Sequence, residues 1–182
     1  MNHVFWPRSL ALVGVAVVVG VVGAPTGSIA KEKTTAGLGL QLHVQFLPPE
    51  DTQQIPAILV SVANVGLADV WVSRRFAFNA PDAPLPFRDV WLEIKDRATG
   101  QQSSFSGEAR VGFTSPQSLA VLGPAQAVGT WISLGPIFGM VHGRTYEIKA
   151  HWHNEMPAEK LPPKGVSSFS GELVAAPLVV KY

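Results

Sequence analysis

The segment Gly143–Asn154, which reads GRTYEIKAHWHN, decides the fold. Its side chains alternate between an apolar set and a polar set: Tyr146, Ile148, Ala150 and Trp152 in the first, and Glu147, Lys149, His151 and His153 in the second. A period of two is typical of a β-strand with one face in a core and the other in water. Gly143 begins the segment, and Asn154 with Pro157 ends it. The pattern therefore predicts one long, half-buried strand.

Tyr146 stands at the head of this strand, shortly after Gly143. A β-sandwich places its tyrosine corner at such a position. The pattern Gly-x-x-Tyr-x-Ile-x-Ala-x-aromatic resembles the late strand of the immunoglobulin-like sandwiches of secreted bacterial proteins, in which one last strand follows it. The resemblance covers the second half of the chain well and the first half loosely. It implies an all-β fold, a single antiparallel immunoglobulin-like β-sandwich of seven to nine strands after an N-terminal signal segment.

Other alternating or apolar runs predict the remaining strands. Turn residues separate them, among them Asn64-Val65-Gly66 and Gly123-Pro124. No stretch outside the leader has a sustained apolar period of 3.6 residues, so we expect almost no helix there. The predicted strands cover residues 40–46, 58–63, 70–78, 89–95, 119–122, 128–134, 143–154 and 169–182.

Residues 1–30 have the features of a signal peptide. Arg8 precedes an apolar run over Leu10–Ala24, which is shorter than the roughly 20 residues that a membrane-spanning helix needs. Ser28 and Ala30 are small residues at the positions that a signal peptidase reads, so Lys31 would begin the mature chain. We therefore expect a signal peptide over 1–30, one sandwich domain over 31–182, and a secreted or periplasmic protein. The alternative is an uncleaved leader that stays as a membrane anchor.

The composition excludes several classes of partner and chemistry. The formal net charge is +1, and Arg8 in the leader accounts for it. A domain without a basic run offers no electrostatic surface for nucleic acid, and we expect contact with a membrane only if the leader is uncleaved. The chain has no cysteine, which excludes disulfides, thiol catalysis and thiolate metal ligands.

His151 and His153 are the strongest candidates for a metal site. Residues at i and i+2 of a strand share a face, and their Cβ atoms lie roughly 7 Å apart, which one metal ion can bridge. The alternative is that both are solvent-facing histidines of a half-buried strand. Imidazole suits copper, zinc or nickel, and soft donors nearby favour copper. The candidates for a further ligand are His43, His142, Met140 and Met156.

The remaining residue patterns give no catalytic signature. Arg74 and Arg75 are neighbours in a predicted strand, so they face opposite ways and form no joint basic patch. No Gly-x-Ser-x-Gly motif is present, and a paired-carboxylate hydrolase would need two carboxylates that converge across strands. We expect carboxylates scattered on the wet faces of the strands: Glu93, Asp96, Glu108, Glu147 and Glu172.

From these observations we expect a non-enzymatic binding or accessory domain, with no catalytic residue, cofactor or metal assigned. Its partner would be a protein or an envelope polymer, bound through loops or an open sheet edge. The alternative is a periplasmic copper- or zinc-handling protein that uses the His-x-His strand.

Overall fold

The computed structural model describes residues 39–47, 55–83, 88–107, 118–156 and 160–182. As predicted, this part of the chain is all-β, apart from a short 3-10 helix η2 (Pro136–Phe138). Within it, no helix is long and apolar enough to cross a membrane. The predicted leader, residues 1–30, lies outside the described residues. The strands are β1 (Leu40–Leu47), β2 (Ala57–Asn64), β3 (Val70–Ser73), β4 (Val90–Asp96), β5 (Leu119–Leu122), β6 (Ala127–Ser133), β7 (Thr145–Asn154), β8 (Ser167–Ser168), β9 (Gly171–Val174) and β10 (Leu178–Lys181).

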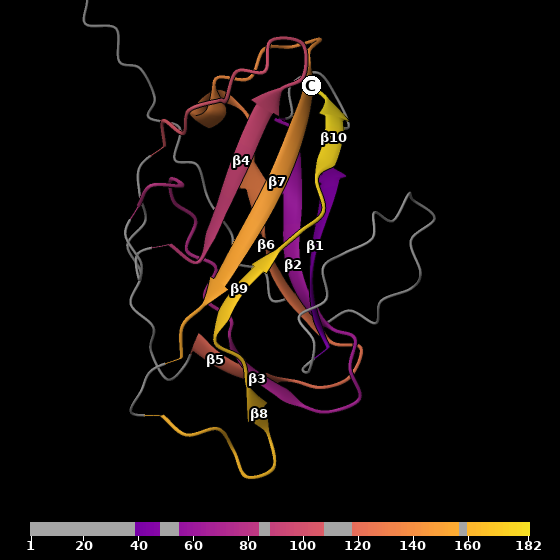
Figure 1. Ribbon diagram of the computed structural model, residues 1–182, viewed down its shortest axis with the longest axis vertical. Coiled ribbons are helices and arrows are strands. Elements are labelled where there is room, and N and C mark those ends of the chain that lie inside the picture. Colours follow the sequence, from indigo (N-terminus) through magenta and orange to yellow (C-terminus); the bar gives the residue numbers. More distant parts are fainter. Residues whose placement is uncertain (1–38, 48–54, 84–87, 108–117, 157–159) are drawn as a thin grey trace, which may run out of the picture.

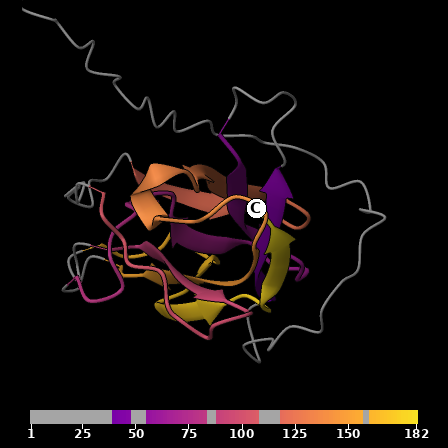
Figure 2. The same ribbon diagram turned by 90° about the horizontal axis from the view of Figure 1, so that it is seen from above.

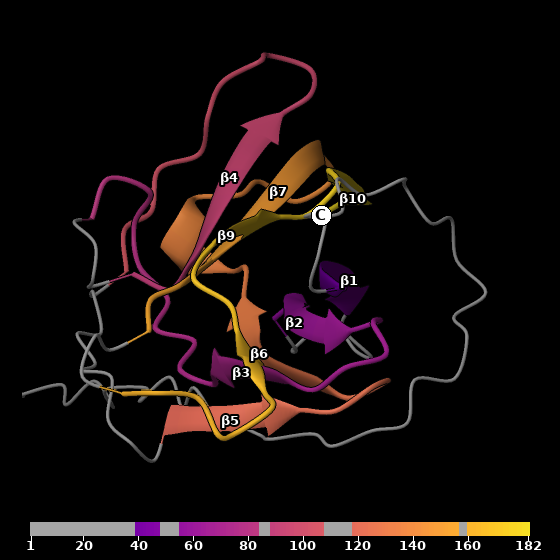
Figure 3. The same ribbon diagram turned by 60° about the horizontal axis from the view of Figure 1, so that its bottom comes forward.

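The strands form three sheets (Figure 1). The β1–β2–β6 sheet lies in one layer, and the β4–β7 sheet lies in the other, with β7 between β4 and β10 and also paired to β9 (Figure 2). The short β5–β3–β8 sheet lies at the lower end, where Figure 3 shows β3 beside β5. All pairs are antiparallel except β3 with β8. One apolar core joins the inward side chains of the two layers, which is a sandwich-like arrangement.

Strand β7 is the long strand that its sequence pattern predicted. One of its edges pairs with β4, and the other pairs with β10 near its start and with β9 near its end. Tyr146, Ile148, Ala150 and Trp152 are buried in the core, which confirms the predicted inward face. β7 therefore holds the β4–β7 sheet together.

The last strand differs from its prediction. One strand was expected over 169–182, but pairing with β7 is divided between β9 and β10. Val174 pairs with His151 and Leu178 pairs with Ile148, so the edge strand carries one more residue than β7 between these points. This is the residue count of a β-bulge. Pro177 lies in the interruption and has no N–H to donate to the ladder.

Asn64 marks the bend where the chain passes from the β1–β2–β6 sheet into the β5–β3–β8 sheet. Its buried side-chain amide donates to the carbonyls of Ala68 and Leu122, both at 2.8 Å, and its Oδ1 accepts from the N–H of Gly66 at 2.9 Å. The predicted Asn-x-Gly turn is therefore confirmed. Beyond it, β3 ends at Ser73 instead of running towards Phe78.

A local hydrogen bond explains the early end of β3. The Ser73 hydroxyl accepts from the N–H of Arg75 at 3.1 Å. Such a bond from a serine to the backbone two residues ahead competes with the sheet ladder and favours a turn. The strand stops there, and Arg75 turns towards the start of β4.

The hydroxyl of Tyr146 makes the hydrogen bond of a tyrosine corner. It accepts from the N–H of Val141, five residues upstream, at 2.7 Å. We expect Tyr146→Phe to lower the free energy of unfolding by about 1 kcal/mol, because the bond is lost while the buried ring remains. The measurement is the urea midpoint, and Tyr182→Phe is the control, because the Tyr182 hydroxyl makes no hydrogen bond within the described residues. An unchanged midpoint for Tyr146→Phe would show that the bond does not stabilise the fold.

Candidate functional site

Ionisable side chains gather where β4 begins and β7 ends. His151 of β7 lies between Glu93 of β4 and Glu172 of β9, and all three belong to the outward face of the β4–β7 sheet. The cross-strand register brings them together. Trp91 of β4 and Val174 of β9 pair with His151, and Glu93 and Glu172 lie two residues from these partners on the same face. We call Glu93, His151, Glu172 and Trp91 the His151 cluster.

Both ring nitrogens of His151 face carboxylates. Nδ1 lies 2.6 Å from Glu172 Oε1, which accepts its hydrogen. Nε2 lies 3.2 Å from Glu93 Oε1 but makes no hydrogen bond with it. His151 therefore contacts a carboxylate of β9 through Nδ1 and a carboxylate of β4 through Nε2, and it lies between the two strands that flank β7.

His151 is buried, which corrects the prediction of a solvent-facing histidine. Only 6% of its surface is exposed. The indole of Trp91 stacks on its ring with centroids 4.7 Å apart and planes at 13°. The Arg88 guanidinium lies over the same Trp91 ring, 4.2 Å from its centroid, so a cation–π contact extends the stack. The alternation correctly predicted the face on which His151 lies, but the Trp91 side chain of β4 covers the imidazole on that face.

The described residues do not assemble the metal site that was considered for His151 and His153. No group of three His, Asp or Glu side chains there is placed to hold a metal ion. His151 has both nitrogens directed at carboxylates, and His153 is half-buried beside Glu172 in the register. Of the further ligands considered, His43 belongs to the opposite layer, and Met140 and His142 precede the other end of β7; only Met156 follows β7 closely.

Glu93, Glu147 and Glu172 lie on the outward face and are partly exposed, as expected, whereas Asp96 is not. Glu93 and Glu172 do converge across strands, but the imidazole of His151 fills the space between them. Asp96 is buried and not solvent-facing, because its carboxylate accepts from the Ala98 N–H and from Arg144, each at 2.8 Å. Glu147 is partly exposed, and Glu108 lies outside the described residues.

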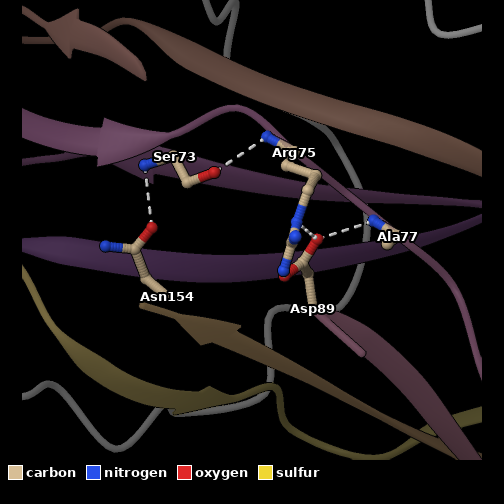
Figure 4. A network of polar contacts seen from close by, with 5 residues as sticks. All are labelled: Ser73, Arg75, Ala77, Asp89 and Asn154. Carbon is tan, nitrogen blue, oxygen red and sulfur yellow. Dashed lines mark hydrogen bonds and ion pairs between the residues drawn. The ribbon is translucent and has the colours of Figure 1, made fainter. Parts of the chain in front are cut away.

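A buried ion pair next to this cluster had no sequence signal (Figure 4). Asp89, 3% exposed, accepts from Arg75 Nε at 2.6 Å and Nη2 at 2.5 Å, and from the N–H of Ala77 at 2.9 Å. Burial raises the pKa of the Asp89 carboxyl above its usual value, and the bonds from Arg75 and Ala77 offset part of that shift. Arg75 is therefore a structural partner, in agreement with the expectation that Arg74 and Arg75 form no joint patch.

Asn154, at the end of β7, joins two sheets beside this pair. Its side-chain oxygen accepts from the Ser73 N–H at 2.8 Å (Figure 4), and its amide donates to the carbonyl of Phe169. Ser73 belongs to β3 and Asn154 to β7, so one buried amide connects the β5–β3–β8 sheet to the β4–β7 sheet. The polar groups at this end of β7 mainly hold strands together.

The outward face of the β1–β2–β6 sheet has a different chemistry. The register places no Asp, Glu, Lys or Arg at the outward positions of these three strands. Trp131 of β6 points outward from this face and is 47% exposed. The outward residues, which we call the Trp131 face, are Gln41, His43, Gln45, Leu47, Ala57, Leu59, Ser61, Ala63, Ala127, Gly129, Trp131 and Ser133.

The Trp131 face was only partly predictable from the sequence. The alternation of Leu40–Phe46 and of Ile58–Ala63 identified which residues point outward, but the pairing of β2 with β6 is needed to bring Trp131 beside them. Comparison of the chain with family models and with curated proteins finds no match.

Proposed function

We propose that this chain is an exported, non-enzymatic binding domain, an immunoglobulin-like β-sandwich that recognises a protein or an envelope polymer. The strand orders β1-β2-β6 and β4-β7-β10 parallel the A-B-E and C-F-G orders of immunoglobulin sandwiches, and the Tyr146 hydrogen bond occupies the matching corner. These features support the immunoglobulin-like part of the proposal.

The observation that carries the binding role is the Trp131 face. Trp131 is 47% exposed on a regular strand, so a large apolar area of its indole lies in water, and a partner that covered it would gain the free energy of burying that area. Tryptophan is also among the residues that dominate binding energies when a partner covers them. The charged side chains near the end of β7 are less suited to bind a partner, because His151 is held between two carboxylates and Arg75 is bound to Asp89. A general base needs a nitrogen directed at its substrate.

The test uses the full chain expressed with its leader in a bacterial host. We expect its intact mass to begin at Lys31, and we expect the purified protein to sediment with an envelope fraction in a saturable manner, displaced by excess untagged protein. A mass that includes Met1 would contradict the cleaved leader. Retention that does not saturate would contradict specific binding.

A further inference from the structure

We infer that the Trp131 face binds an uncharged polysaccharide, with a sugar ring stacked on the Trp131 indole. This inference rests on the proposed binding function and names its ligand class and its surface. The argument uses the shape of the face, its charge and the spacing of its polar groups.

Trp131 has small neighbours on its own strand and is 47% exposed. On β6 its same-face neighbours are Gly129 and Ser133, and the residue opposite is Leu59. A side chain at Gly129 cannot be accommodated, because its Cβ would lie 2.5 Å from the carbonyl oxygen of Val60. Along β6, therefore, no large side chain stands next to the indole on this face. An indole in this position is a platform that fits the C–H face of a pyranose, because the ring face carries a negative quadrupole.

The polar side chains of the Trp131 face can form hydrogen bonds with the hydroxyl groups of a ligand, but they offer no charge to pair with an ionised ligand. Gln45, Leu59 and Trp131 lie in one cross-strand row. Strands are spaced by about 4.8 Å, so Gln45 and Trp131 are about 10 Å apart along this row. A glutamine amide can both donate and accept, as a sugar hydroxyl does. One row therefore offers an aromatic platform and an amide to two sugars of one extended chain.

The absence of charged side chains from the Trp131 face disfavours several classes of partner. The outward positions of the β4–β7 sheet carry Glu93, Lys95, Glu147 and Lys149, whereas the Trp131 face carries no Asp, Glu, Lys or Arg. Nucleic acids and anionic lipid surfaces require Lys or Arg contacts. A second copy of the chain is also disfavoured, because Leu47, Leu59 and Trp131 are the only large apolar residues of the Trp131 face, whereas stable dimers bury about 800 Å² per partner with an apolar centre.

The experiment measures depletion of the full chain from solution by suspensions of cellulose, chitin and an insoluble β-1,3-glucan. We expect the wild type to be retained by at least one of them, with an affinity that does not fall as salt rises, because no ion pair is involved. We expect Trp131→Ala to weaken this affinity by at least about tenfold, as for a central aromatic contact. Trp131→Phe keeps a smaller platform and should retain part of the affinity.

Val179→Ala is the matched control, because Val179 is 48% exposed on the other layer; its affinity should equal that of the wild type. Thermal unfolding of each variant verifies that it is folded. Retention by none of the three polymers, equal affinity for Trp131→Ala, or a dimer that Trp131→Ala dissociates would overturn the inference. If Trp131→Ala still sediments with the envelope fraction like the wild type, the proposed function stands and this surface is wrong. If the wild type binds neither the envelope nor a polysaccharide, both fail.

Discussion

Trp152→Ala should lower the free energy of unfolding by about 3–5 kcal/mol, the usual cost of removing a buried aromatic side chain. Trp152 is 0% exposed and lies at the centre of the core. Its ring stacks on Phe76 with centroids 6.0 Å apart and on Phe169 with centroids 5.8 Å apart. Phe76 follows β3 and Phe169 follows β8, so the indole connects the β4–β7 sheet with both segments.

Trp152→Phe is the control for this prediction. It keeps an aromatic ring between Phe76 and Phe169, and it removes the indole N–H, which is buried without a hydrogen-bond partner in the described structure. Because an unpaired buried N–H is itself costly, part of the lost packing is offset, and the loss should be clearly smaller than for alanine. Urea unfolding followed by circular dichroism measures both. A loss of less than about 1 kcal/mol for Trp152→Ala would show that the core does not depend on this ring.

The inward orientation of Trp152 was predictable from the local sequence, whereas the burial of His151 under Trp91 was not. Alternation in β7 assigns each residue to a face, because successive side chains of a strand point to opposite sides. Exposure depends on what the neighbouring strands contribute. Trp91 is 60 residues from His151, and only the pairing of β4 with β7 places it over the imidazole. The alternation therefore predicted correctly which face carries His151, but the expectation that its side chain is exposed to solvent was wrong.

The same distinction explains the other differences from the sequence predictions. The Asn64 turn was recognised because its hydrogen bond to Gly66 spans two residues. Pro177 is a local signal for the division of the last strand, but the one extra residue relative to β7 appears only in the register. The Trp131 face needed two registers, β1 with β2 and β2 with β6. Features within a turn or a strand were accessible from the sequence, and features that require register between strands were not.

The ion pair between Arg75 and Asp89 leads to a second large effect, which depends on pH. Arg75→Met should cost about 3–5 kcal/mol near pH 7, because it leaves the Asp89 carboxylate buried without its cation. Asp89 keeps the bond from the Ala77 N–H, and His153 is the nearby titratable group that acts on it. Neither replaces the two bonds from the guanidinium.

The sign of the pH dependence follows from the direction of the Asp89 pKa. Burial raises this pKa in the folded state, so the carboxyl contributes most to stability below its unfolded pKa of about 3.9, where it is neutral in both states. That contribution is lost as pH rises through the folded pKa. Removal of Arg75 takes away a group that lowers the folded pKa, so the loss on raising the pH becomes larger in the variant. The destabilisation by Arg75→Met should therefore grow from about pH 4 to about pH 7.

Urea unfolding of the wild type and of Arg75→Met across this pH range measures the effect. The double variant Arg75→Met, Asp89→Leu should be more stable than Arg75→Met near pH 7, because it removes the unpaired charge together with its partner, and its stability relative to the wild type should vary less with pH. Arg144→Met is a second control. Its partner Asp96 also binds two backbone N–H groups, and the Arg144 side chain is half exposed, so water screens the pair and a smaller loss is expected. A cost of Arg75→Met that is constant with pH would show that the Asp89 charge is not what Arg75 stabilises, and that its packing against the chain accounts for the loss.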